Sequence, residues 1–246
     1  MIYPIINEIY RSGTVRDKDG NTIPLRGNID PVEGQFLFDL ILQDTSIKQT
    51  LEVGCGFGLS SLYICSALES RSTPKHTIID PYQRENYLGI GILNLERSNT
   101  SFFELIESQS ELALPDLLKR ELNSYDLIFI DGFHSFDQVS LDSFYANRLL
   151  RVGGYMVFDD CSFASVSKVL SYILKFPAYE FHSQVEETSS KKRFLRFFVK
   201  LLPEEILPYI LPLKLFNLCN RLRFTSMVAI KKISEDSRNN NWFSEF

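Results

Sequence analysis

The sequence has few cysteines, no excess of positive charge and no long apolar run. Its four cysteines, Cys55, Cys65, Cys161 and Cys219, lack the paired spacing of a disulfide scaffold or a zinc site. The formal net charge of -5 argues against a nucleic-acid binder held by bulk electrostatics. No apolar run is long enough to span a bilayer, and residues 1–10 lack the pattern of a signal peptide. These absences predict a soluble cytoplasmic protein with reduced thiols.

The composition is that of an ordinary globular protein, with 44% hydrophobic and 23% charged residues in a chain of 246. The most informative stretch is 51–58 (LEVGCGFG), where an apolar run ends in Glu52 and glycines alternate at Gly54, Gly56 and Gly58. Helical spacing follows over 59–68, so the stretch predicts a strand, a tight turn and a helix. Glycine tolerates positive φ and lets backbone approach a ligand, and the N–H groups of a helix start point towards it. A GxGxG motif alone is a weak signal.

Apolar periodicity predicts strands alternating with helices on both sides of this turn. Strands are expected at 50–53, 76–80, 102–106, 125–131, 155–158, 178–185 and 226–230, and helices at 32–42, 59–68, 83–98, 115–122, 136–150 and 165–176. The alternation predicts an α/β fold of the Rossmann-like, doubly wound type. We expect a mostly parallel seven-stranded sheet with helices on both faces.

The domain organisation follows from where this alternation starts and stops. Residues 1–31 are rich in turn formers and predict an N-terminal arm, with a short helix near 5–10. The domain is expected to span 32–233, and the polar residues 234–246 to form a flexible tail. Residues 187–224 interrupt the alternation and predict a helical insert before the last strand.

The insert combines basic and aromatic residues over 191–202 (KKRFLRFFVKLL). On a helix this gives an apolar stripe with a basic border, the composition of an interfacial helix. Three interpretations stay open for it: a cap over a ligand pocket, a dimer surface, or contact with an anionic membrane or lipid-linked substrate.

Acidic and polar residues follow the predicted strands. Asp80 follows the second strand, Ser108 to Glu111 the third, Asp131 the fourth, and Asp159 and Asp160 the fifth. In open α/β sheets the ligand lies beyond the carboxyl ends of the strands. Asp80 lies roughly 20 residues past the glycines, the spacing at which a carboxylate binds ribose hydroxyls. Alternatively, an aspartate before proline only starts a turn.

The order of these residues separates two kinds of nucleotide site. A dehydrogenase requires a later third glycine, where this chain has Leu59. The pattern ExGxGxG at 52–58, Asp80 and the strand 125–131 (YDLIFID) resembles class I S-adenosylmethionine-dependent methyltransferases. The runs 130–136 (IDGFHSF), 150–154 (LRVGG) and 158–160 (FDD) narrow the resemblance to small-molecule O-methyltransferases, such as those of catechol and macrolide sugars. The resemblance covers about residues 32–186 and 226–232.

The resemblance implies a cofactor site. Glu52, Gly54, Gly56 and Gly58 would hold the aminocarboxypropyl end of S-adenosyl-L-methionine, Asp80 the ribose diol, and the turn with Gln109 and Ser110 the adenine, with Asp131 also at the cofactor. Asp131, Asp159 and Asp160 stand where metal-dependent relatives keep magnesium ligands. Mg2+ prefers oxygen ligands and would lower the pKa of an acceptor hydroxyl.

Other interpretations of the same residues stay open. Asp131 could be a structural acid, and Asp160 could cap the helix that follows. His134 is the candidate general base, acting with Asp131, because histidine changes charge near neutral pH. Equally, it could orient the Asp131 turn. His76 and His182 are expected to be structural.

The sequence thus predicts an S-adenosylmethionine-dependent methyltransferase that acts on a small-molecule hydroxyl of a sugar, phenol or secondary metabolite, with Mg2+ assistance left open. The alternative is an S-adenosylmethionine-binding module without transfer activity that works through its basic insert. The expected partner is a small-molecule acceptor and not nucleic acid. Membrane-surface contact through 191–202 and a homo-oligomer stay open.

Overall fold

The computed structural model describes residues 2–186, 225–239 and 242. The predicted insert and its basic stretch lie outside the described residues. The elements follow in the order α1 (Pro4–Ser12), β1 (Thr14–Arg16), β2 (Thr22–Pro24), α2 (Pro31–Gln43), β3 (Gln49–Val53), α3 (Leu59–Leu68), β4 (Lys75–Ile79), α4 (Ile90–Arg97), β5 (Phe103–Ile106), α5 (Ser110–Arg120), β6 (Tyr125–Ile130), α6 (Phe136–Leu149), β7 (Leu150–Phe158), α7 (Ala164–Ile173), β8 (Tyr179–Glu186) and β9 (Thr225–Lys232).

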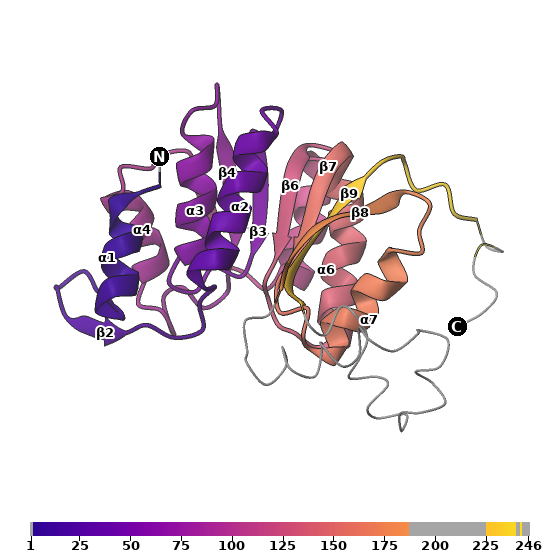
Figure 1. Ribbon diagram of the computed structural model, residues 1–246. Coiled ribbons are helices and arrows are strands. Elements are labelled where there is room, and N and C mark those ends of the chain that lie inside the picture. The colour runs from indigo at the N-terminus through magenta and orange to yellow at the C-terminus, as the bar shows by residue number, and fades with distance from the viewer. Residues whose placement is uncertain (1, 187–224, 240–241, 243–246) are drawn as a thin grey trace, which may run out of the picture.

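Seven strands form one sheet in the order β5-β4-β3-β6-β7-β9-β8. The pairs among β5, β4, β3, β6 and β7 are parallel, whereas β9 is antiparallel to both β7 and β8. One hydrophobic cluster joins the sheet to α1 to α4, and a second joins it to α5, α6 and α7. Figure 1 shows α1 to α4 at one end of the molecule and α6 and α7 at the other. The predicted doubly wound fold, mostly parallel with helices on both faces, is confirmed.

Strands β3 and β6 lie at the centre of the sheet and are covered on both faces. Every residue of β6 is buried, as expected of a parallel strand covered on both faces. In β3, Leu51 and Val53 belong to the cluster on the α5 to α7 side. Between β3 and β6 the chain order reverses, which is the position where such sheets bind ligands.

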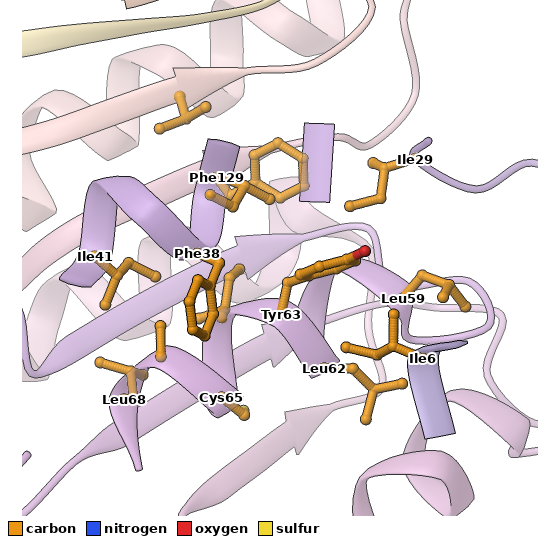
Figure 2. Packing of buried hydrophobic residues seen from close by; sticks show 14 of the residues in the cluster. Ile6, Ile29, Phe38, Ile41, Leu59, Leu62, Tyr63, Cys65, Leu68 and Phe129 are labelled. Carbon is orange, nitrogen blue, oxygen red and sulfur yellow. The ribbon is translucent and has the colours of Figure 1, made fainter. Parts of the chain in front are cut away.

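The layer of α2 and α3 packs closely against this centre. A Cβ atom on Gly34 of α2 would lie 2.1 Å from the ring of Tyr63 of α3, so only glycine allows this approach. Figure 2 shows Tyr63 among Phe38, Ile29 and Leu62 in the interior between helices and sheet. This packing fixes the start of α3, which follows the glycine turn.

The N-terminal segment is more regular than an arm. The helix expected near 5–10 is present as α1, and its residues Ile6 and Ile9 are buried in the core. The expectation that the rest is loop is wrong where β1 and β2 pair as an antiparallel hairpin. The division at residue 31 stays a prediction.

Three elements begin at least five residues away from their predicted first residues. Helix α4 begins at Ile90 and not at residue 83, because residues 81–89 form turns that end at Gly89 with φ +70°. Helix α5 begins at Ser110 and includes Pro115, which removes one backbone donor without ending the helix. Strand β7 begins at Leu150, since an irregularity in its pairing with β6 accommodates the glycines before residue 155.

The described part of the tail contacts the domain. Asp236 accepts a hydrogen bond from the Asn147 side chain at 3.0 Å, and the guanidinium of Arg238 lies 3.3 Å from the ring centre of Phe176. The flexibility of the tail stays a prediction. Within the described part of the chain, no helix is both long and apolar enough to cross a membrane.

Candidate functional site

Backbone hydrogen bonds bring the residues that follow the central strands to one edge of the sheet. In each case the residue after a strand donates its N–H to the last carbonyl of the neighbouring strand. The four bonds run from Gly54 to Ile79 (2.9 Å), Asp80 to Ile106 (3.3 Å), Asp131 to Val53 (2.9 Å) and Asp159 to Ile130 (3.1 Å). The strand-end acids found in the sequence therefore meet at the point where the strand order reverses.

The glycine turn lies directly against the end of β6. Gly54 has φ +88°, and a Cβ atom there would lie 2.0 Å from the carbonyl oxygen of Asp131. Gly58 has φ +81° and precedes α3, where a Cβ would lie 2.7 Å from the carbonyl oxygen of Gly91. Both positions combine a left-handed conformation with backbone contact, so they require glycine. Gly56 has more room, with its nearest neighbour 3.5 Å away.

Asp80 is buried beneath this turn, with 4% of its surface exposed. Its Oδ2 accepts hydrogen bonds from the N–H groups of Cys55 (3.0 Å) and Gly56 (2.9 Å). Its Oδ1 accepts from the N–H of Tyr82 at 2.8 Å. The turn-starting role considered for Asp80 is thus present, and the carboxylate also supports the glycine turn.

Glu52 lies behind the turn and not in the pocket. It is fully buried, accepts a hydrogen bond from Ser61 of α3, and lies 3.1 Å from Nε2 of His76, whose Nδ1 contacts Thr50 at 2.8 Å. Its Oε1 has no hydrogen-bond partner among the described residues. Glu52 therefore joins β3, β4 and α3 in this conformation, and its contact with a cofactor stays a prediction. His76 has the structural position expected of it.

A pocket of about 790 Å³ opens at this edge of the sheet. Among the predicted site residues, it is lined by Gly54, Gly56, Asp80, Gln109, Ser110, Asp131, His134, Asp159 and Asp160, but not by Glu52 or Gly58. Gln109 is the N-cap residue of α5, and Ser110 accepts a hydrogen bond from the Gln138 amide of α6 at 2.8 Å. The structure thus brings most of the predicted residues to one cavity.

His134 and the acids Asp131, Asp159 and Asp160, the predicted catalytic and metal-binding groups, line the same pocket. Nε2 of His134 lies 2.5 Å from Oδ2 of Asp160 and 3.8 Å from Oδ1 of Asp131. One ligand atom from each of these three residues lies within 4.8 Å of the others, a spacing that suits one cation. Asp159 is more deeply buried, at 8% exposure. The suggestion that Asp160 caps the next helix is wrong, because the N-cap of α7 is Phe163.

Comparison with known proteins agrees with this geometry. Residues 51–161 match the family model described as a methyltransferase domain. Over these residues the chain is therefore similar to a methyltransferase domain. No curated protein matches this chain in sequence.

Solved structures share the fold of this chain at low identity. An O-methyltransferase from Bacillus cereus in complex with SAH has 16% identity and a TM-score of 0.64, over 92% of this chain and 90% of that one. The O-methyltransferase TomG from Streptomyces achromogenes, involved in tomaymycin synthesis and solved with SAM, has 13% identity and a TM-score of 0.61, over 84% and 82%. At these identities the likeness concerns the fold.

The acids of this pocket disfavour one another's ionisation. Burial raises the pKa of Asp131 well above its ordinary value, and the charges of Asp159 and Asp160 raise it further. Burial likewise raises the pKa of Asp159, followed by the charges of Glu33 and Asp160. A bound cation would favour the ionised forms.

The sequence analysis missed Glu33, which belongs to this group of acids. It is 9% exposed, lines the pocket, and its pKa is raised, first by burial. Asp30 and Glu33 form a capping box at the start of α2, in which Glu33 accepts from the N–H of Asp30 at 2.7 Å. The capping box is visible in the sequence, but its position at the pocket follows only from the packing of α2.

Two exposed aromatic residues at the pocket were also missed. Phe133 lines the pocket and is 77% exposed, and the ring of Phe163 contacts His134 edge-on with centroids 5.4 Å apart. The sequence alone does not indicate whether a phenylalanine next to a motif is exposed to solvent.

Proposed function

We propose that this protein transfers the methyl group of S-adenosyl-L-methionine to a hydroxyl of a small molecule. The observation that carries the proposal is that the glycine turn, Asp80 and the acid cluster with His134 line one pocket of about 790 Å³. That size suits a nucleoside-containing donor beside a small acceptor. The donor, when bound, supplies an electrophilic methyl carbon on a sulfonium, so that an O–CH3 bond forms as the S–CH3 bond breaks.

The acidic lining of the pocket favours the binding of a positively charged donor. Its lining includes six acidic residues and, within the described part of the chain, no lysine or arginine; the acids are Glu33, Asp80, Glu111, Asp131, Asp159 and Asp160. A wall of this sign attracts a sulfonium more strongly than its neutral thioether product. The same field favours a divalent cation.

At the donor end we assign binding to the backbone of Gly54 and Gly56, to Asp80 for the ribose hydroxyls, and to Gln109 and Ser110 for the adenine, with Asp131 adjacent. Gly58 and Glu52 lie outside the pocket lining, and Glu52 accepts a hydrogen bond from Ser61 of α3. The N–H groups of Gly54, Cys55, Gly56 and Gly58 are used within the protein, so the carboxylate of the donor would bind the first N–H groups of α3.

At the acceptor end we assign the role of general base to His134. Its Nδ1 contacts the main-chain carbonyl of Gly132 at 2.7 Å, which leaves Nε2 towards the acids. Nε2 would accept the proton of the acceptor hydroxyl, and Asp160 and Asp131 would stabilise the imidazolium that results. His134 would therefore remove the proton, and the two acids would stabilise the positive charge of its imidazolium.

The donor set also fits a divalent cation. Asp131, Asp159 and Asp160 are the residues that would hold Mg2+ through carboxylate oxygens, with Nε2 of His134 at the same position. The cation would supply Lewis-acid activation of the acceptor hydroxyl. Burial, followed by the charges of neighbouring acids, raises the pKa of Asp131 and of Asp159, and a bound cation would offset this effect.

Calorimetry with S-adenosylhomocysteine tests the cofactor site first. We expect binding, and no binding at millimolar ligand would contradict the proposal. Radiolabelled S-adenosyl-L-methionine with a panel of sugars, phenols and secondary metabolites then tests transfer. Binding without transfer to any acceptor would favour the alternative of a binding module, whose predicted insert lies outside the described residues.

The metal is tested separately from the cofactor. With a methylated acceptor in hand, we expect D159A/D160A to abolish Mg2+-dependent turnover while S-adenosylhomocysteine still binds. Unchanged wild-type turnover in EDTA would remove the cation and leave His134 as the activating group.

A further inference from the structure

Gln83, in the loop between β4 and α4, joins the two parts of the donor site. It is buried, with 1% exposure. Its Nε2 donates to the main-chain oxygen of Gly56 at 2.8 Å and to Oδ2 of Asp80 at 3.0 Å. Its Oε1 is buried and has no partner within the described residues. One amide group thus connects the glycine turn to the acid assigned to the ribose.

The hydrogen bonds of Asp80 show what this connection does. Oδ2 accepts from Gln83 and from the N–H groups of Cys55 and Gly56, three donors in all. Among the described residues, Oδ1 accepts only from the N–H of Tyr82. Each carboxylate oxygen has two lone pairs. Oδ2 is therefore saturated, and Oδ1 keeps one acceptor position for a ligand.

We propose that Gln83 is a positioning residue for the methyl donor, which fixes the Asp80 carboxylate so that Oδ1 accepts a ribose hydroxyl and fixes the Gly56 peptide in the turn. This inference rests on the proposed function, because it deepens the assignment of Asp80. Gln83 acts through Asp80 and Gly56 and does not line the pocket.

The start of α4 holds Gln83 in place. The N–H of Gly89 donates to the main-chain oxygen of Gln83 at 2.6 Å. A Cβ atom on Gly91 would lie 2.7 Å from the oxygen of Gly56 and 2.8 Å from Oε1 of Gln83. The side chain is therefore confined between α4 and the turn, with little space for another rotamer. Such confinement is what a positioning role requires.

The variant Q83E tests the inference through pH. The substitution keeps the shape of the side chain but replaces the donating amide by a carboxyl group. When ionised, this group faces the acceptors of Asp80 and Gly56 and repels them; when protonated, it donates one hydrogen bond. We expect the Kd of S-adenosylhomocysteine to rise about tenfold or more at pH 8 relative to wild type, and to return to within about threefold at pH 5.5.

The titratable groups near position 83 are not expected to produce this pH dependence of binding. Burial, followed by the charge of Glu52, raises the pKa of the Cys55 thiol, and burial, followed by the charge of Asp80, raises that of the Tyr87 hydroxyl. Neither group ionises between pH 5.5 and 8. Wild type measured at both pH values accounts for the groups that the two proteins share.

Two further variants complete the experiment. Q83M keeps the length of the side chain without a donor or a titrating group, so we expect weaker binding at both pH values without recovery. Q35E is the matched control, since the exposed Gln35 amide of α2 donates to Asp39 at 2.8 Å, and we expect it to bind like wild type at both pH values. Circular dichroism at both pH values checks folding.

The outcomes separate the two proposals. Wild type that fails to bind S-adenosylhomocysteine contradicts the proposed function. If wild type binds, a Q83E-to-wild-type affinity ratio that is the same at both pH values overturns the role of Gln83. If Q83E fails to fold, Q83M decides: an affinity equal to wild type overturns the inference, and a loss of about tenfold supports it.

Discussion

The α-carbon of Gly54 and the main-chain carbonyl of Asp131 are in such close contact that a Cβ atom on residue 54 would lie 2.0 Å from the carbonyl oxygen. The glycine turn and the first acid of the cluster are therefore coupled through backbone and not through side chains. A change that moves one of them must also move the other.

This contact predicts a large effect for G54A, which can be separated from backbone strain by G20A. Gly20 in the β1–β2 turn has φ +85°, close to the +88° of Gly54, but no atom lies within 4 Å of its Cβ position. We expect G20A to cost about 1 kcal/mol of unfolding free energy in urea and G54A about 3 kcal/mol or more, with loss of S-adenosylhomocysteine binding. Equal costs for the two variants would show that the contact adds nothing.

His134 is expected to affect turnover and not donor binding. In H134Q we expect kcat to fall by roughly 10²- to 10⁴-fold, because the variant has no general base at the acceptor hydroxyl, while the Kd of S-adenosylhomocysteine stays unchanged. H182Q is the matched control, since His182 lies on β8 against the ring of Tyr155. If H134Q retained wild-type kcat, only the orienting role of His134 would remain.

Glu33 is expected to oppose folding in the absence of a cation and to favour cation binding. Because its pKa is raised, chiefly by burial, its ionised form is disfavoured in the folded state at neutral pH. E33Q keeps an acceptor for the capping box. In EDTA at pH 7.5 we expect E33Q to be more stable than wild type, by on the order of 1 kcal/mol.

The second half of this prediction concerns the cation itself. By electron paramagnetic resonance, we expect E33Q to bind Mn2+ more weakly than wild type. E96Q is the control, since Glu96 is exposed on α4. Equal Mn2+ affinity in E33Q and wild type would place Glu33 outside the cation's influence.

Asp142 on α6 predicts a pH dependence of stability. It is 1% exposed, and burial raises its pKa to about 6 from an ordinary value of 3.8. Below pH 3.8 the carboxyl is protonated in both states and has no effect. Between these two values the unfolded state releases the proton first, so stability falls as pH rises, and above pH 6 the cost is full, at most about 3 kcal/mol.

The variant D142N removes this cost. We expect the stability of D142N relative to wild type to increase from pH 4 to pH 6.5, measured by urea unfolding. D137N on the same helix should be less stable than wild type by an amount that hardly changes over this range, because a hydrogen bond from Ser135 lowers the pKa of the exposed Asp137 from 3.8 and its contribution is fully present above that value. A difference between D142N and wild type that is constant with pH would contradict the assignment.

Much of the fold could be predicted because its signals are local. Helix α3 begins and ends as its apolar spacing indicated, and the strand predicted at 125–131, which is mostly apolar, is β6 at the centre of the sheet. The boundaries that failed depended on contacts between segments. Helix α4 starts late because residues 81–89 are held in turns, in part by the hydrogen bond between Gly89 and Gln83.

The candidate site divides in the same way. Asp80, Asp131 and Asp159 were predictable, because parallel strands deliver the residues after their ends to one edge. Glu33 and Gln83 were not, since nothing in the spacing of α2 or of the loop after β4 places them near these acids.

By itself the sequence determined the alternation of strands and helices, the glycine turn and the acids at the strand ends, because backbone conformation and strand polarity follow from nearby residues. The tertiary structure decided which groups can act. It buried Glu52 with Ser61 and His76 behind the turn, and it brought His134 to within 2.5 Å of Asp160. Burial and distance between segments are properties of packing, and packing decides which side chains face the pocket.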